Sequence, residues 1–225
     1  MNGPYTEEYY RKIQEGSLQS AREVVPLLLS LIQPKSVLDV GCGTGAWLSA
    51  FKEHGIEDVW GIDDEKVCST TLLFERDRFK DFDLGKAFQI DHKVDLVISL
   101  EVAEHLPPRC AGTFIQSLVK IGPIVMFSAA IPGQGGLNHL NEQWPDYWAT
   151  HFRSHGYLCI DCLRRKIWNN NKIKFWFRQN ILLYVEQEYL KTCPSLATQY
   201  EADRYAPLSL VHPELYLRKQ LLGIS

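Results

Sequence analysis

Two short polar segments carry the side chains whose types and spacing are best suited to chemistry. The segment Glu101-Val-Ala-Glu104-His105 follows an apolar run, and its carboxylates and imidazole share one face of a helix if a helix begins there. His139 lies in a second, glycine-rich segment that begins at Pro132. An imidazole in such a loop is a candidate catalytic residue, the general base for a hydroxyl or an amine. The alternative is a histidine that only closes the loop by hydrogen bonding.

The same segments also offer the ligands of a divalent metal ion. Two carboxylates and two imidazoles suit manganese, iron or zinc better than magnesium. A carboxylate and an imidazole can instead serve only to order the loop and the helix, so metal binding stays an alternative. The candidate ligands are Glu101, Glu104, His105 and His139.

A glycine-rich turn, Asp39-Val40-Gly41-Cys42-Gly43-Thr44-Gly45, points to a nucleotide-like ligand. Glycines in such a turn let the backbone approach a ligand without Cβ clashes. A dinucleotide would bring an anionic pyrophosphate to this helix N-terminus, beside the carboxylate of Asp39. S-adenosylmethionine brings a sulfonium and an ammonium instead, and both are cations. Asp63 ends the next apolar run, where a carboxylate can accept hydrogen bonds from two ribose hydroxyls.

Apolar runs that alternate with helical patterns predict the elements that position these residues. Such alternation favours a mostly parallel sheet covered by helices on both faces, with ligands at the carboxyl ends of its strands. A capping-box pattern, Ser20-x-x-Glu23, predicts that the first helix begins at about residue 20. The expected strands are 36–40, 59–62, 94–100, 124–130, 157–163 and 181–185, and the expected helices include 46–54, 102–106 and 113–121.

Together the motifs between residues 36 and 131 resemble those of the class I S-adenosylmethionine-dependent methyltransferases. The resemblance rests on the glycine turn, on Asp63, on Asp83-Leu84 and on the run Asp95-Leu-Val-Ile-Ser-Leu-Glu-Val-Ala-Glu-His-Leu106. It implies an α/β, Rossmann-like, doubly wound sheet of seven strands, with one strand antiparallel near the C-terminus. We expect one domain over 1–188, in which 1–33 form a helical cover. An irregular tail over 189–225 is predicted by Pro194, Pro207 and Pro213. The implied cofactor-binding residues are Asp39, Gly41, Cys42, Gly43, Gly45, Asp63, Asp64, Asp83, Leu84, Leu100 and Glu101.

The acceptor of the methyl group is expected to be a small molecule (a sugar, a natural product or an amino-acid derivative) that receives it on oxygen or nitrogen. Methyl transfer needs alignment and exclusion of water, and it needs a base only where the acceptor carries a proton. The alternatives are a metal-dependent RNA 2′-O-methyltransferase and a non-catalytic subunit that binds S-adenosylmethionine. Tyr9 and Tyr10 precede the predicted first helix and either cover the pocket as a lid or pin the N-terminus to the core. The other candidate acceptor contacts are Asn141, Glu142 and Trp144.

The remaining features bear on partners and compartment. The basic, aromatic stretch 164–178 predicts a solvated hairpin around Asn169-Asn170-Asn171, and a net charge of −3 makes nucleic acid an unfavoured partner. No apolar leader or membrane-length run is evident, so we expect a cytoplasmic protein. Cys159 and Cys162 form a lone CxxC, which favours two buried strand residues over a zinc site. The oligomeric state stays open.

Overall fold

A computed structural model describes residues 7–64 and 72–221, with side chains described for 14–64 and 72–218. Its seven strands form one sheet in the order β3-β2-β1-β4-β5-β7-β6. All neighbouring strands are parallel except β7, which runs antiparallel to both β5 and β6. This confirms the predicted fold class. The strands are β1 (Ser36–Val40), β2 (Asp58–Asp63), β3 (Phe79–Asp81), β4 (Leu96–Leu100), β5 (Ile124–Ser128), β6 (Tyr157–Ile160) and β7 (Leu182–Glu186).

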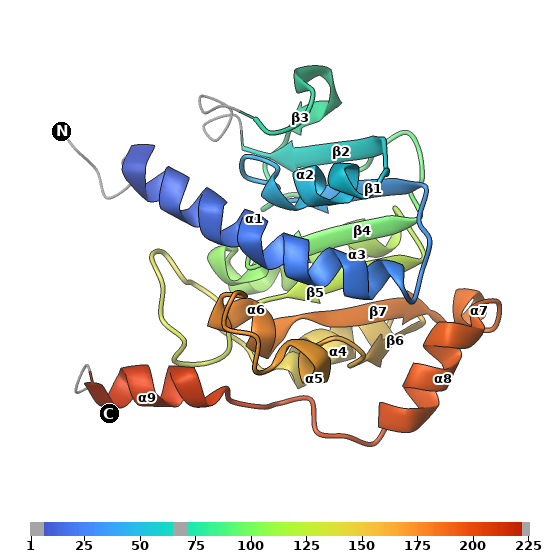
Figure 1. Ribbon diagram of the computed structural model, residues 1–225. Helices are drawn as coiled ribbons and strands as arrows, with labels where there is room; N and C mark the ends of the chain where they lie inside the picture. Colours follow the sequence, from blue (N-terminus) through green and yellow to red (C-terminus); the bar gives the residue numbers. More distant parts are fainter. Residues whose placement is uncertain (1–6, 65–71, 222–225) are drawn as a thin grey trace.

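Helices cover both faces of this sheet (Figure 1). Successive residues of β4 point to opposite sides, so Leu96 packs with Leu28 of the first helix and Val97 packs with Phe114 behind the sheet. The helices are α1 (Glu7–Leu29), α2 (Ala46–Glu53), α3 (Ala111–Val119), α4 (Pro145–Arg153), α5 (Arg164–Ile167), α6 (Phe175–Asn180), α7 (Gln187–Leu190), α8 (Pro194–Asp203) and α9 (Pro213–Leu221), with short 3-10 turns η2 (Arg76–Arg78), η3 (Ala103–His105) and η4 (Pro108–Cys110). Among the described residues, no helix has the length and apolar character needed to cross a membrane.

The first helix starts earlier than the capping-box pattern predicts. Ser20 lies in the middle of α1, and its hydroxyl donates to the backbone carbonyl of Gly16, 2.7 Å away. A serine inside a helix can satisfy its hydroxyl this way, so the pattern Ser-x-x-Glu does not by itself mark a helix start. The prediction of a start near residue 20 is therefore wrong. Tyr9 and Tyr10 lie within α1 and not before it, and their side chains fall outside the described residues.

Two predictions about the C-terminal third are also wrong. The stretch 164–178 forms helices α5 and α6 instead of a hairpin, because Ile167, Ile173 and Phe177 turn into the core. The tail that begins at residue 189 is largely helical instead of irregular. Leu196 of α8 is fully buried in the core beside α1, and Leu215 of α9 is buried against Phe175 of α6.

Candidate active site

The glycine turn between β1 and α2 lies at the carboxyl end of the parallel strands, as predicted. Gly41 has φ +84°, and a Cβ atom there would lie 2.3 Å from Cγ2 of Val102. The backbone N–H of Gly41 donates to the carbonyl of Ile62 over 2.8 Å, and that of Gly43 donates to Oδ2 of Asp63 over 2.7 Å. These hydrogen bonds fix the turn against the end of β2, and the side chain of Asp63 accepts one of them.

Two carboxyl groups near this turn lie in surroundings that disfavour their charged forms. Asp39 is 3% exposed, and burial, together with the negative charge of Asp63, raises its pKa well above the usual value. Burial also raises the pKa of Asp63, although N–H donors from Gly43 and Asp64 partly oppose the effect. A cationic ligand placed beside the pair would relieve this cost.

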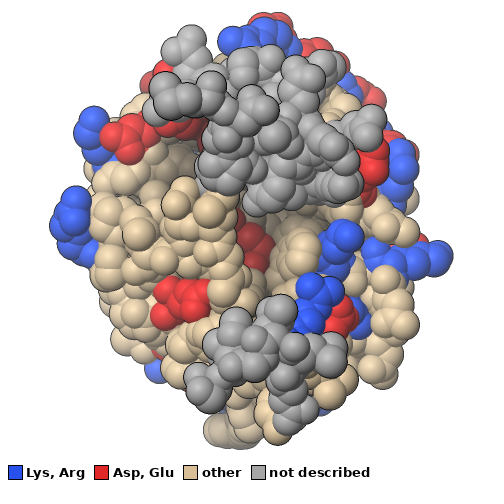
Figure 2. Space-filling model, turned by 90° about the vertical axis from the view of Figure 1, so that its left-hand side faces the viewer, with Lys and Arg blue, Asp and Glu red and all other residues tan. Residues whose placement is uncertain are grey.

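A cleft of about 340 Å³ opens beside these carboxyl groups. In Figure 2, which looks onto the side where the parallel strands end, acidic atoms lie in the depth of a hollow. Six of the predicted cofactor-binding residues line the cleft, namely Gly41, Asp63, Asp64, Asp83, Leu84 and Glu101. The lining residues that the sequence did not single out for the cofactor are Phe82, Gly85, Val102, His105 and Leu106. Predicted residues outside this lining are Asp39, Cys42, Gly43, Gly45 and Leu100.

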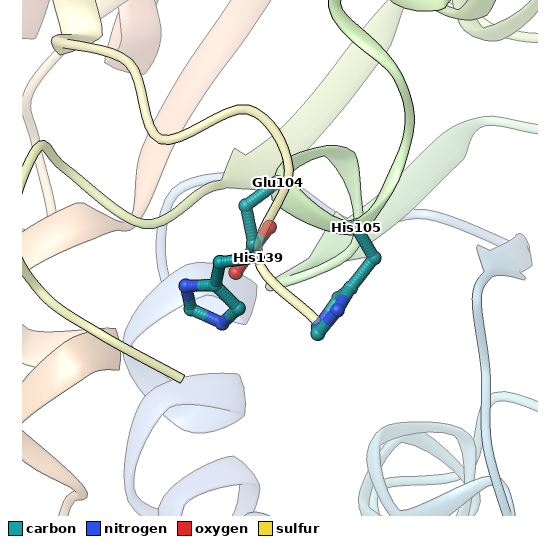
Figure 3. Close-up of side chains that lie close together, drawn as sticks. All are labelled: Glu104, His105 and His139. Carbon is teal, nitrogen blue, oxygen red and sulfur yellow. The ribbon is translucent and has the colours of Figure 1, made fainter. Parts of the chain in front are cut away.

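Three of the four candidate metal ligands converge. One ligand atom each of Glu104, His105 and His139 lies within 4.8 Å of the others. Glu104 is fully buried, and neither of its carboxylate oxygens has a hydrogen-bond partner. Figure 3 shows its carboxylate between the two imidazole rings, which come from η3 and from the glycine-rich loop.

Glu101, the fourth candidate, is not part of this cluster. The shared helical face on which its convergence depended does not form, because η3 begins only at Ala103 and Glu101 has φ +56°. Its oxygens accept hydrogen bonds from the amides of Gln134, at 2.9 Å, and Asn180, at 3.0 Å. Burial raises the pKa of Glu101, and these donors oppose the effect. Sequence reasoning missed both amides, since nothing local marks a buried glutamine or asparagine as a partner of Glu101.

His139 is held by Glu142 inside the segment 132–144, hereafter the glycine loop. Oε1 of Glu142 lies 2.8 Å from Nδ1 of His139 and also accepts the N–H of Gly135, while Oε2 accepts the N–H of Gly133. Glu142, predicted as an acceptor contact, therefore closes the glycine loop. A carboxylate on Nδ1 fixes the tautomer with Nε2 unprotonated, so Nε2 can accept a proton or bind a metal ion.

The other predicted acceptor contacts divide between buried and exposed positions. Asn141 is 2% exposed, and its N–H donates over 2.9 Å to the backbone carbonyl of Glu104, which also accepts the N–H of Leu140. Asn141 thus anchors the glycine loop to η3. Trp144 is 40% exposed at the start of α4 and is available to a ligand.

The basic residues of 164–178 are largely engaged within the protein. Arg164 is fully buried and pairs with Asp161 over 2.6 Å. Arg178 is buried and pairs with Glu214 of α9, and Lys172 pairs with Glu23 of α1. These cations tie α5, α6 and the loop between them to their neighbours.

Comparisons with known proteins establish the family and the fold. The model of the methyltransferase domain family matches residues 9–164. Norajmaline N-methyltransferase of Rauvolfia serpentina is 28% identical over 110 residues, which cover 44% of this chain and 37% of that enzyme, so the match spans little more than a third of the relative. Magnesium protoporphyrin IX methyltransferase of Synechocystis, solved with bound S-adenosylhomocysteine, superposes with a TM-score of 0.54 at 18% identity, covering 83% of this chain and 90% of that one.

The methyltransferase domain of a bacterial Hen1 has a TM-score of 0.51 at 20% identity, over 74% of this chain and 97% of that domain. At such identities the superpositions establish a shared fold. The family model covers well over half of the chain and includes the glycine turn, Asp63 and the segment that begins at Glu101. The chain therefore belongs to the methyltransferase domain family, within the class I S-adenosylmethionine-dependent methyltransferases.

Proposed function

We propose that this protein transfers the methyl group of S-adenosylmethionine to an oxygen or nitrogen atom of a small molecule. The observation that carries the proposal is the carboxyl pair Asp39 and Asp63. Burial raises the pKa of both groups, and a cationic ligand would stabilise their charged forms. In this assignment Asp63 holds the ribose hydroxyls and Asp39 faces the ammonium group. Asp83 and Leu84 flank the adenine.

The walls on the acceptor side favour a small and partly apolar acceptor. The glycine loop contains no lysine or arginine, and neither does the segment 101–108. A polyanion such as RNA needs cations for its phosphates, whereas Arg164 of α5 and Arg178 of α6 are paired with carboxylates within the protein. Leu137, Leu140 and Trp144 instead expose apolar surface on and beside the glycine loop, at 39%, 59% and 40%. Such side chains stabilise an apolar body by burial.

His139 is the candidate general base for an acceptor that carries a proton. Glu142 stabilises the imidazolium that forms when Nε2 accepts this proton. The sulfonium leaves as a neutral thioether, so the protein needs no acid for the leaving group. The remaining contribution is alignment of the acceptor and the methyl group and exclusion of water from the cleft.

A second candidate is metal-dependent transfer to an oxygen acceptor. Burial and the negative charge of Glu101 raise the pKa of Glu104 well above its usual value. A cation bound between Glu104, His105 and His139 would stabilise the charged carboxylate. The donor set of one carboxylate and two imidazoles suits manganese, iron or zinc. A bound metal would supply Lewis-acid activation and orientation of the acceptor oxygen. This candidate uses Nε2 of His139 as a ligand and so excludes its role as base.

Transfer of a labelled methyl group from S-adenosylmethionine into a cell extract tests both candidates. The extract is separated into small-molecule, protein and nucleic-acid fractions, and the Asp63→Ala variant gives the background. Label in the small-molecule fraction supports the proposal, and label in RNA overturns it. Retention of full activity after treatment with a chelator overturns the metal candidate. No binding of S-adenosylhomocysteine by calorimetry would remove the function altogether.

A further inference from the structure

Glu101, at the end of β4, is held in a conformation that a glutamate rarely adopts. Its φ is +56°, in the left-handed region. Its backbone N–H donates to the carbonyl oxygen of Ser128, at 3.0 Å, and to the hydroxyl of the same residue, at 3.1 Å. Strain of this kind persists only where surrounding contacts over-determine the conformation, and it gathers at functional sites.

The side chain of Glu101 is fixed by a closed arrangement of hydrogen bonds, the Glu101 clamp, which consists of Glu101, Gln134 and Asn180. The amide of Asn180 donates to Oε1 of Glu101 over 3.0 Å, and the amide of Gln134 donates to Oε2 over 2.9 Å. Asn180 also donates to Oε1 of Gln134 over 2.9 Å. Since Gln134 belongs to the glycine loop and Asn180 ends α6, the clamp fastens that loop to two fixed elements.

The clamp continues into the C-terminal segment through one fully buried side chain, Gln179. Its amide nitrogen donates to Oε1 of Gln134 over 3.1 Å, and its Oε1 accepts the backbone N–H of His212 over 2.8 Å. His212 is itself buried, and its Nε2 donates to the carbonyl of Trp168 over 2.8 Å. A chain of hydrogen bonds thus runs from residue 212 to the carboxylate that lines the cleft.

An apolar contact joins the same two regions by a separate route. Leu215 of α9 packs with Ile131 and Phe175 in a small cluster of its own. Ile131 immediately precedes the glycine loop, so α9 lies against the root of that loop. Figure 1 shows α9 below the glycine loop on the side where the parallel strands end.

We infer that the segment 212–215 is a buttress that positions the glycine loop over the cleft, and that Gln179 and Asn180 are the positioning residues through which it acts. The inference assigns a role in methyl transfer to a segment outside the residues that the family model covers. It depends on the family activity but not on the identity of the acceptor. The physical basis is that a buried polar network is stable only when every member is satisfied, so loss of one amide loosens the others.

Hydrogen exchange of the full chain with bound S-adenosylhomocysteine tests the buttress. Asn180→Leu and Gln179→Met remove the amides and keep the volume of the side chain roughly constant. We expect backbone amides in 132–144 to exchange about tenfold faster in either variant, because each variant loses two or more hydrogen bonds of the buried network. In Gln179→Met the affinity for S-adenosylhomocysteine should change by less than about threefold, since the glycine turn and Asp63 are untouched and Glu101 keeps both of its amide donors.

Asn170→Leu is the matched control. Its amide donates to Glu23 over 2.9 Å and ties the loop between α5 and α6 to α1, away from the clamp. Exchange in 132–144 should stay unchanged in this variant. Unchanged exchange in 132–144 on loss of Gln179 or Asn180, or an equal acceleration over the whole chain, would overturn the inference.

A kinetic measurement separates positioning from general stability. Once an acceptor fraction is found, the rate at saturating S-adenosylmethionine should fall in Gln179→Met while the KM for S-adenosylmethionine is kept. Changes of equal size in this rate and in the KM for S-adenosylmethionine would contradict a role in positioning the glycine loop. If the wild-type chain fails to bind S-adenosylhomocysteine, the proposed function fails, and exchange measured in the unliganded chain still decides whether the buttress exists.

Discussion

The negative charge of Asp63 adds to the burial that already raises the pKa of Asp39. The two carboxyl groups lie on neighbouring strands, because β1 pairs in parallel with β2 and aligns Asp39 with Gly61, two residues before Asp63. The fold thus places two like charges where both are partly withheld from water. Such an arrangement destabilises the unliganded protein and favours a cation in the cleft. Removal of the Asp39 charge should therefore raise the stability of the unliganded protein and lower its affinity for the ligand.

Replacement of Asp39 by asparagine should stabilise the unliganded protein. A carboxyl whose pKa is raised on folding binds its proton more tightly in the folded state. The free energy of unfolding therefore falls as pH rises from the unfolded pKa through the folded one, and the full penalty is present above both. Asp39→Asn removes this penalty, so its gain in Tm over the wild type should grow between pH 4.5 and 7.5.

The same substitution should weaken binding of S-adenosylhomocysteine by about tenfold or more, because an interaction with the ammonium is worth roughly 1.5–3 kcal/mol. Thermal unfolding and calorimetry measure the two effects on one sample. Asp91→Asn, at an exposed carboxyl, is the control and should change neither. Weaker binding together with a lower Tm would show that Asp39 has a purely structural role.

Alanine at Gly41 should destabilise the protein by more than alanine at Gly55. Both glycines have φ +84°, so both variants carry the cost of a left-handed alanine, about 1–2 kcal/mol. Only at Gly41 does the new Cβ meet a neighbour, at 2.3 Å from Val102, whereas nothing lies within 4 Å at Gly55. The difference in free energy of unfolding between the variants isolates the clash. Gly41→Ala should also lose affinity for S-adenosylhomocysteine, and Gly55→Ala should keep it.

The central sheet and the cofactor side of the site were predictable from the sequence. The strand at 36–40 was placed at its observed bounds, and the helix predicted over 46–54 begins at Ala46 as expected. Apolar runs and glycine turns are local signals, and a parallel sheet brings the residues after each strand to one edge. Asp63, Asp83 and Leu84 therefore fell into the cleft where the sequence placed them.

The predictions that proved wrong share one physical cause, which is tertiary contact between segments that are distant in the sequence. Over its described side chains α1 packs on the core, as do α5 and α6, and such packing stabilises helices where local patterns do not predict them. Glu101 leaves the expected helical face because Gln134 and Asn180, 33 and 79 residues away, hold its carboxylate. No periodicity or motif encodes such pairs.

Removal of Arg164 alone should destabilise the fold far more than removal of its whole ion pair. The pair with Asp161 is buried, and Arg164 also donates to the carbonyl of Leu208 over 2.7 Å. Arg164→Leu leaves an uncompensated buried carboxylate and should cost about 3–5 kcal/mol in free energy of unfolding. The double variant with Asp161→Leu should recover most of this loss. Chemical denaturation of the single and double variants measures it, and strictly additive losses would contradict the pairing.

Replacement of Glu142 by alanine should impair transfer and spare cofactor binding. The change removes the acceptor for Nδ1 of His139 and for the N–H groups of Gly133 and Gly135. Without the carboxylate the imidazole loses its fixed tautomer and the stabilisation of its protonated form, so transfer to a proton-bearing acceptor should fall by about 10²-fold or more.

The measurement is transfer of labelled methyl to the small-molecule fraction, with the affinity for S-adenosylhomocysteine followed in parallel. Glu53→Gln, which alters a glutamate paired with Arg22 on the surface, serves as the control. A loss of transfer with unchanged affinity assigns the His139–Glu142 pair to the acceptor step. An equal loss of both would mean that Glu142 supports the cleft as a whole, and unchanged transfer would exclude His139 as a base that depends on this carboxylate.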